Sequence, residues 1–143
     1  MSNIHLFMKR NKTAKENVRY APTKSLCDES GAPLEFEIRA LTTKEDERIR
    51  DNCTVEIPIT GKPNMYRSKV NATKYIGELL AASVVYPDLL DAELQDSYRV
   101  KTAEDLLKEM IDDPGEYTEF TMFVQKFNGF NVSLDEKVDE AKN

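Results

Sequence analysis

The sequence contains few of the residues from which metal and nucleophilic sites are usually built. Its 143 residues include one histidine, His5, and two cysteines, Cys27 and Cys53, which have no C-x-x-C spacing. This pattern argues against a disulfide framework and a thiolate zinc site. A histidine-based general base or a multi-histidine metal site would depend on a single residue near the start of the chain. We expect no metal, and two reduced, partly buried thiols.

Glycine-rich loops and nucleophile motifs are also absent from the sequence. The five glycines stand singly at positions 31, 61, 77, 115 and 129, so that no GxGxxG, GxxxxGK[ST] or GxSxG motif is present. Adjacent carboxylates such as Asp112 and Asp113 match a glycosidase pair only in residue type, because helix ends commonly collect acids. We therefore predict that the protein is not an enzyme and takes no cofactor and no small-molecule substrate.

Long hydrophobic runs are missing as well. No stretch approaches the roughly 18 apolar residues that a membrane span requires, and the first ten residues, MSNIHLFMKR, lack the pattern of a secretory leader. The 40% content of hydrophobic residues fits a soluble globular protein. We predict a cytoplasmic protein with no membrane partner.

Charge is present in two blocks of opposite sign within a chain of net charge −6. Residues 1–24 contain six basic residues and one acidic residue, a net charge of +5, whereas residues 88–119 contain eleven acidic and three basic residues, a net charge of −8. Such blocks can steer a charged partner or a second copy of the chain, and the alternative is that both are solvated surfaces. We predict self-association through the basic arm, while the overall acidity disfavours nucleic acid as a partner. The cations expected in this contact are Lys9, Arg10, Lys12, Lys15 and Arg19.

The first third of the chain has the patterns of β-structure. Residues 18–26 and 34–41 are extended runs joined by turn residues, and in the second run apolar and charged residues alternate with the period of a strand. These runs predict a β-hairpin or a small antiparallel sheet. Thr42 and Glu45 then form a capping-box pattern at the start of a polar surface helix. Residues 54–70, which contain two prolines and a glycine, predict an irregular connection or a short edge hairpin.

The remainder of the chain predicts helices. Asn71 is placed to cap a helix from Ala72 to about Val85 with a broad apolar stripe, and Pro87 ends it. The fold class is therefore α+β and mainly α-helical, with the hairpin or sheet followed by about four to six helices. The predicted parts of this single domain are a flexible basic arm (1–17), a β-rich part with one surface helix (18–70), a helical core (71–130) and a polar C-terminal helix or tail (131–143).

The stretch VVYPDLLDAELQDSY, residues 84–98, places four carboxylates within nine positions. A calcium loop beginning at Asp88 needs glycine at its sixth position and glutamate at its twelfth, but Glu93 and Arg99 stand there. Asp91 is instead well placed to cap a short helix, with Glu93 near its positive end. The carboxylates therefore predict helix boundaries, and the leucines between them become candidates for contact with a partner.

Several blocks of the sequence resemble one known family, in the same order along nearly the whole chain. They are NKTAKENVRY, DESGAPLEFEIRALT, KYIGELLAASVVYPDLLDAELQDSY, AEDLLKEMIDDPGEY and QKFNGF. Together they resemble the XkdN-like tail assembly chaperones of phages and phage-like elements of Gram-positive bacteria. The resemblance implies a small cytoplasmic protein that binds the long tape measure protein of the phage tail. It further implies that this protein keeps the tape measure soluble while tail-tube subunits assemble around it, and is absent from the mature tail.

The resemblance also implies the partners. The tape measure protein is the main one and the tail-tube protein a second, with action that is transient during virion assembly. The alternative is a structural tail component, or a small protein-binding adaptor, that is retained in the particle. A protein that binds its partner without catalysing a reaction must contact it through exposed apolar residues that the core does not use. The candidates are Leu89, Leu90, Leu94, Met65, Tyr66 and Met122.

Overall fold

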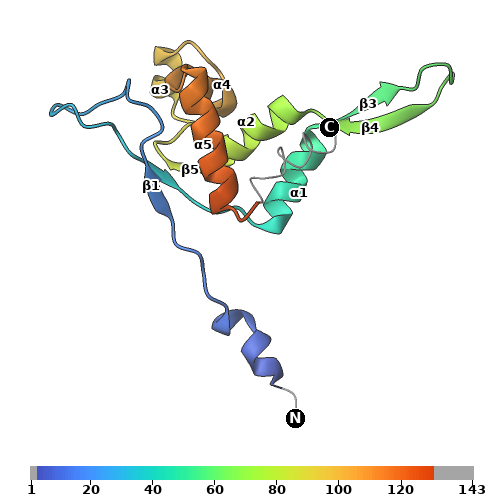
Figure 1. Cartoon of the computed structure of the whole chain (residues 1–143), viewed down its shortest axis with the longest axis horizontal. Coiled ribbons are helices and arrows are strands. Elements are labelled where there is room, and N and C mark those ends of the chain that lie inside the picture. The colour runs from blue at the N-terminus through green and yellow to red at the C-terminus, as the bar shows by residue number, and fades with distance from the viewer. Residues whose placement is uncertain (1–2, 131–143) are drawn as a thin grey trace, which may run out of the picture.

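A three-stranded antiparallel sheet forms the platform on which the helices of this protein pack (Figure 1). The computed structural model describes residues 3–130. The elements in chain order are η1 (Ile4–Phe7), η2 (Lys9–Asn11), β1 (Val18–Tyr20), β2 (Phe36–Ile38), α1 (Thr43–Asn52), β3 (Thr54–Pro58), β4 (Tyr66–Val70), α2 (Ala72–Ser83), β5 (Val84–Tyr86), α3 (Ala92–Ser97), α4 (Ala103–Met110) and α5 (Pro114–Phe127). This architecture confirms the predicted α+β class, with four helices after residue 71 in the described part of the chain.

The sheet has the strand order β1–β2–β5, and both of its strand pairs are antiparallel. The prediction that α2 continues to about Val85 is wrong, because the helix ends at Ser83 and the third strand of the sheet follows it directly. Val84 pairs with Ile38, and the Arg39 N–H donates to the Ser83 carbonyl at 2.9 Å. Valines suit a strand as well as a helix end, so the partner strand decides the conformation. The strands β1 and β2 are also shorter than predicted, at three residues each.

Side-chain caps fix where the helices begin, as the local sequence predicts. The Thr42 hydroxyl accepts a hydrogen bond from the Glu45 N–H, and the Glu45 carboxylate accepts one from the Thr42 N–H, which completes the capping box. Arg39 donates two hydrogen bonds, of 3.0 and 2.5 Å, to the same carboxylate. This charge-assisted pair lowers the pKa of Glu45 to about 2. The remaining α-helices are capped by Asn71, Asp91, Thr102 and Asp113.

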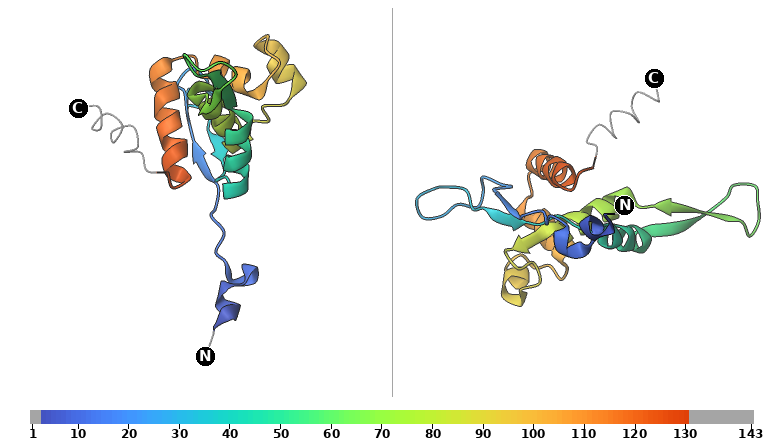
Figure 2. Two further views of the ribbon diagram at one scale, coloured as in Figure 1. Left: turned by 90° about the vertical axis from the view of Figure 1, so that its right-hand side faces the viewer. Right: turned by 90° about the horizontal axis from the view of Figure 1, so that it is seen from below.

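The hydrophobic core lies between the sheet and helices α2, α4 and α5. Phe36 and Ile38 of β2 are almost completely buried. Phe120 of α5 stacks on Tyr20 at a centroid distance of 5.7 Å and meets Phe36 edge-on at 6.3 Å, so α5 covers one face of the sheet, as Figure 2 shows. The other buried members of the core are Leu80, Leu89, Leu106, Leu107, Met110, Ile111 and Val124.

Polar contacts join α5 to the N-terminal third of the chain. The Leu41 N–H donates to the Asn128 side-chain oxygen at 2.6 Å, and the Thr23 hydroxyl donates to Glu116 at 2.8 Å. Gly129 follows the helix with a φ of 82°, a left-handed conformation that glycine adopts without a steric penalty. The last described helix is therefore fastened to segments from the beginning of the chain.

The β3–β4 hairpin and the N-terminal arm both project from this body (Figures 1 and 2). The hairpin of β3 and β4 has five cross-strand pairs, from Thr54 with Val70 to Pro58 with Tyr66, which resolves residues 54–70 as the short hairpin. The N-terminal arm leaves the body at the start of β1 and carries η1 and η2 away from it. None of the helices within residues 3–130 is both long and apolar enough to cross a membrane. The polar helix or tail predicted for 131–143 lies outside the described residues.

Candidate partner-binding surfaces

The turn after β5 places two neighbouring leucines in opposite environments. Leu89 is 4% exposed and belongs to the core, whereas Leu90 is 76% exposed. The turn is fixed by two hydrogen bonds: the Leu90 N–H donates to the Asp88 carboxylate at 3.0 Å, and the Gln95 amide donates to the Leu89 carbonyl at 2.8 Å. The expectation that Leu89 is presented to a partner is therefore wrong, because its side chain completes the core. Leu94 is partly buried against the same core, so Leu90 alone of the three leucines is fully available.

Three exposed apolar side chains lie on β5 and on the turn that follows it. Val85 is 43% exposed and Tyr86 is 65% exposed, and both lie within six residues of Leu90. We name Val85, Tyr86 and Leu90 the β5 patch. The strand that carries it lies at an edge of the three-stranded sheet. The local sequence is typical of the end of an apolar helix at Val85 and Tyr86, so their exposure could not be predicted from it.

Two of the four carboxylates near the β5 patch in the sequence have structural roles. Asp91 accepts a hydrogen bond from the Leu94 N–H at 2.8 Å and caps α3, as predicted, while Asp88 fixes the turn. Glu93 and Asp96 are exposed on α3. Within residues 3–130, no group of three or more histidine, cysteine, aspartate or glutamate side chains is arranged to hold a metal ion. Negatively charged side chains therefore precede and follow Leu90 along the chain.

The β3–β4 hairpin has one face that is richer in apolar residues than the other. Cross-strand partners share a face and neighbours alternate, and the Ile59 N–H donates to the Met65 carbonyl, which continues the ladder by one pair. We name as the hairpin face the side that carries Val55, Ile57, Ile59, Met65, Arg67 and Lys69. Tyr66 pairs with Pro58 and lies on the opposite side, with the polar pair of Glu56 and Ser68. The register thus separates the neighbouring candidates Met65 and Tyr66, which are 53% and 57% exposed.

A hollow of about 330 Å³ lies at the root of the hairpin face. Val55, Ile57 and Lys69 line it together with the first residues of α2. An isolated two-stranded ribbon is marginally stable in water, so a surface of this kind gains stability from a partner. The hairpin face therefore offers an apolar strip with positive charge along one strand.

Met122 is the remaining candidate from the sequence. It is 52% exposed on α5, whereas Phe120 and Val124 of the same helix are completely buried. A single exposed apolar side chain is ordinary on a protein surface. Met122 therefore carries less weight as a contact residue than the grouped side chains of the other two surfaces.

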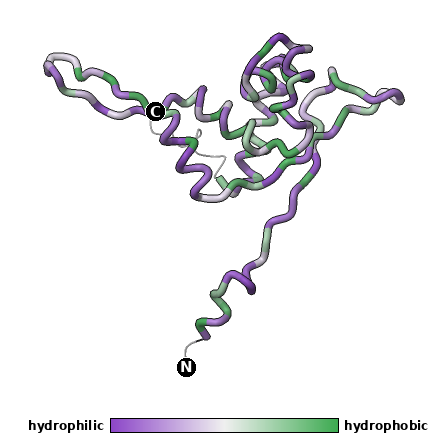
Figure 3. Tube along the Cα trace, turned by 180° about the vertical axis from the view of Figure 1, so that it is seen from behind, coloured by the Kyte–Doolittle hydropathy of each residue, from purple (hydrophilic) through white to green (hydrophobic). Residues whose placement is uncertain are grey.

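The N-terminal arm combines apolar and basic side chains. Ile4, Leu6, Phe7 and Met8 are 57%, 68%, 83% and 38% exposed, and apolar positions, green in Figure 3, recur along this part of the trace. In the sequence, the run IHLFM directly precedes the first cations of the arm. The arm is thus amphipathic in composition as well as basic.

The five predicted self-association cations are not equivalent in the structure. The Lys15 ammonium donates to the Phe127 carbonyl and lies 4.5 Å from the centre of the Phe127 ring, so Lys15 attaches the base of the arm to α5. Arg10 lies 3.4 Å from the His5 ring nitrogen, and Arg19 is an exposed residue of β1. Lys9, Arg10 and Lys12 are the cations carried by the exposed end of the arm.

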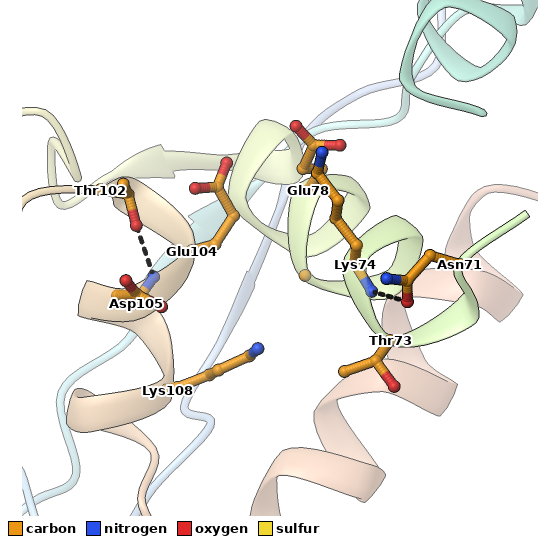
Figure 4. Close-up of a pocket in the computed structure, with 9 residues that line it drawn as sticks. Asn71, Thr73, Lys74, Glu78, Thr102, Glu104, Asp105 and Lys108 are labelled. Atoms are coloured by element: carbon orange, nitrogen blue, oxygen red, sulfur yellow. Dashed lines mark hydrogen bonds between the residues drawn. The ribbon is translucent and has the colours of Figure 1, made fainter. Parts of the chain in front are cut away.

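A polar hollow of about 280 Å³ lies between α2 and α4 (Figure 4). Gly77 of α2 is buried here, facing Glu104 of α4. Asn71 and Thr102, at the rim, are used as helix caps. The charged side chains of the hollow are of both signs: Lys74, Glu78, Glu104, Asp105 and Lys108. The arrangement is that of a surface depression between two helices, with mixed charges and capping groups.

The thiols are placed differently from one another. Cys27 is exposed, whereas Cys53 is buried and its thiol donates a hydrogen bond to Glu78 at 2.6 Å. Burial, followed by the effect of Glu78, raises the pKa of Cys53 to about 11. A thiol with a raised pKa is a poor nucleophile at neutral pH.

Taken together, these features are typical of a protein that binds other proteins. Its exposed apolar side chains lie on projecting or edge elements, and its carboxylates cap helices. A family model described as the phage XkdN-like tail assembly chaperone matches residues 4–142. The chain belongs to this family of tail assembly chaperones.

Individual relatives agree with this assignment. The chain is 22% identical over 142 residues to the phage-like element PBSX protein XkdN of Bacillus subtilis, an alignment that covers 99% of this chain and 94% of the relative. It is 21% identical over 141 residues to the protein YqbN of the same strain, covering 99% of this chain and 93% of the relative. A crystal structure of YqbN has the same fold, with a TM-score of 0.75 at 19% identity over 92% of this chain and 99% of that structure.

Membership of the family confirms the resemblance seen in the sequence and fixes the general role. Proteins of this kind assist phage tail assembly, so the partners belong among phage tail proteins. The relative XkdN belongs to a phage-like element of Bacillus subtilis, which is consistent with a prophage protein. A chaperone family also points to a role without catalysis.

Proposed function

We propose that this chain binds the tape measure protein of a phage tail in the cytoplasm, keeps it soluble while the tail tube assembles around it, and is absent from the mature tail. The family assignment supports a role in tail assembly. A tape measure is a long chain that exposes apolar surface until the tube encloses it. Reversible coverage of that surface by a small acidic protein, of net charge −6, would oppose its aggregation.

The hairpin face is the surface that we propose for this contact. It projects from the body and carries four aliphatic or methionine side chains beside two cations, Arg67 and Lys69. An apolar strip with a basic border suits an amphipathic helix whose rim is acidic. The single observation that carries this choice is the register, which puts Val55, Ile57, Ile59 and Met65 on one side of a ribbon that has little protein behind it.

Co-expression with the tape measure gene of the same phage or prophage tests both the function and the surface. The wild-type chain is expected to raise the soluble fraction of the tape measure protein, and the variants Val55→Ser and Met65→Ser to lower that gain. Tyr66→Ser is the matched control, since it removes an equally exposed side chain from the opposite side of the same hairpin. Far-ultraviolet circular dichroism of each variant confirms that the fold is retained.

Two results would contradict this proposal. If the tape measure protein is equally soluble with and without the chain, the chaperone function fails. If Tyr66→Ser and Met65→Ser reduce solubility equally, the hairpin face is the wrong surface. Mass spectrometry of purified tails tests departure from the particle, because a retained structural component would appear there in stoichiometric amount.

We also propose that the chain self-associates through its basic arm. The +5 charge of residues 1–24 and the −8 charge of residues 88–119 favour contact between the arm of one copy and the acidic surface of another. Sedimentation at low and high salt checks this, because screening weakens contacts between exposed charges. An oligomer indifferent to salt, or a monomer under both conditions, would count against it.

A further inference from the structure

The exposed end of the arm has apolar residues that its own charges do not account for. Ile4, Leu6 and Phe7 are each more than half exposed, and Phe7 reaches 83%. The run is followed at once by Lys9, Arg10 and Lys12. A purely electrostatic arm has no use for such side chains, whose exposure to water is unfavourable by about 25 cal/mol per Å² of apolar surface. The composition is that of a docking peptide with an apolar anchor and a basic flank.

One surface of the body has the complementary composition. The β5 patch offers Tyr86 and Leu90, 65% and 76% exposed, and Asp88, Glu93 and Asp96 lie close to these residues in the sequence. The hairpin face is also apolar, but it bears Arg67 and Lys69, which have the same sign of charge as the arm. Charge therefore selects the β5 patch and disfavours the hairpin face as the receiving surface.

We infer that the Ile4–Met8 segment of one copy seats on the β5 patch of a second copy, with its basic flank against the carboxylates of α3 and the preceding turn. This inference deepens the proposed self-association by adding an apolar contact and naming the receiving site. Arm and patch are different surfaces, so each copy gives one contact and receives one. Repetition of such a head-to-tail contact produces an open row or a closed ring.

The contact between two copies is small and therefore weak. Five residues cover much less than the roughly 800 Å² per partner of a standard interface, so each link is readily broken. The two contributions also respond differently to salt. The ion pairs are screened as salt rises, whereas burial of Leu6 and Phe7 is not, so high salt weakens the association without abolishing it.

Cross-linking between two differently labelled copies tests the contact directly. In a background with Cys27→Ser, one preparation carries Lys9→Cys and the other carries Glu93→Cys, which leaves the apolar contacts in place. The mixed disulfide dimer is expected to form from these two preparations. The matched control replaces the second with a Met122→Cys preparation, which presents an exposed thiol on α5 away from the patch. Equal cross-linking to both sites would overturn the inference.

Sedimentation equilibrium on the full chain gives the energetic test. Replacement of Leu6 or Phe7 by serine, or of Leu90 by serine, is expected to weaken association about tenfold or more, since a buried leucine or phenylalanine contributes a comparable factor. Met122→Ser is the control and is expected to leave the association constant unchanged. If the Leu90→Ser variant associates like the wild type, the β5 patch is not the receiving site.

A chain whose arm folds back on its own body would also be recognised. A single chain carrying both Lys9→Cys and Glu93→Cys would then form an internal disulfide and sediment as a monomer, which would overturn docking on a second copy. These experiments use no tape measure protein. If the chain keeps the tape measure protein soluble but fails the cross-linking test, only the arm contact is refuted. If cross-linking succeeds but the tape measure protein is not kept soluble, only the proposed function is refuted.

Discussion

Replacement of two adjacent leucines by alanine separates a core position from a surface position. Leu89→Ala removes a side chain that is 4% exposed and packs in the central cluster, whereas Leu90→Ala removes one that is 76% exposed. Loss of a buried leucine costs the transfer free energy of the removed atoms and the energy of the remaining cavity, typically 2–5 kcal/mol. We expect a loss of about 3 kcal/mol for Leu89→Ala and of less than about 0.5 kcal/mol for Leu90→Ala.

Urea unfolding followed by far-ultraviolet circular dichroism measures this difference, since the chain has no tryptophan to serve as a fluorescent probe. With an m-value of roughly 2 kcal/mol per M, the midpoint of Leu89→Ala falls by about 1.5 M. The midpoint of Leu90→Ala stays within experimental error of the wild type. Equal midpoints for the two variants would refute the assignment of Leu89 to the core and Leu90 to the surface, and with it the geometry of the β5 patch.

Three further predictions concern other parts of the molecule. Glu45→Gln is expected to cost about 1 kcal/mol, because solvent screens a pair with Arg39 that is about a third exposed. The carboxylate has a lowered pKa, so its contribution is present above about pH 5 and is lost as the pH falls from 4.5 towards 2; urea titrations at several pH values check this, and a variant as stable as the wild type at pH 7 would refute it. A thiol reagent is expected to label Cys27 in the native protein and Cys53 only after unfolding, and rapid labelling of both would contradict the burial of Cys53. Gly77→Ala is expected to stabilise the protein by up to about 1 kcal/mol, because the added Cβ would lie at ordinary contact distances of 3.7 Å or more and alanine favours the helix; a lower melting temperature would show that the α2–α4 contact is tighter than this.

The helix starts could be predicted because the interactions that fix them are local. Thr42 and Glu45 lie within one turn of each other, and Asp91 caps the helix that directly follows it. Such caps depend on residues three positions apart, so the pattern can be recognised directly in the sequence. The same locality allowed Asp91 to be predicted as the cap of a short helix.

The third strand and the exposure of individual apolar side chains could not be predicted, because both depend on residues that are distant in the sequence. Val84 adopts an extended conformation where Ile38 lies beside it, and nothing in the local sequence announces that neighbour. Leu89 and Leu90 are the same residue type, and only the conformation of the turn decides that the side chain of Leu89 points into the core. For the same reason the sequence predicts either an irregular connection or a hairpin for residues 54–70, because each strand of a hairpin is stabilised by the other. The sequence therefore offered Leu89 and Leu90 as equivalent candidates, and only the structure shows that Leu89 is buried and Leu90 is exposed.

The attachment of α5 to the beginning of the chain has a consequence for synthesis on the ribosome. The hydrogen-bond partner of Thr23 lies 93 residues further along the chain, and that of Leu41 lies 87 residues further along. At about 5–20 residues per second, the first strands emerge roughly 5–20 s before the helix that covers them. The face of the sheet that α5 covers therefore stays exposed until late in synthesis, and pauses in translation before α5 would prolong the exposure of Tyr20 and Phe36.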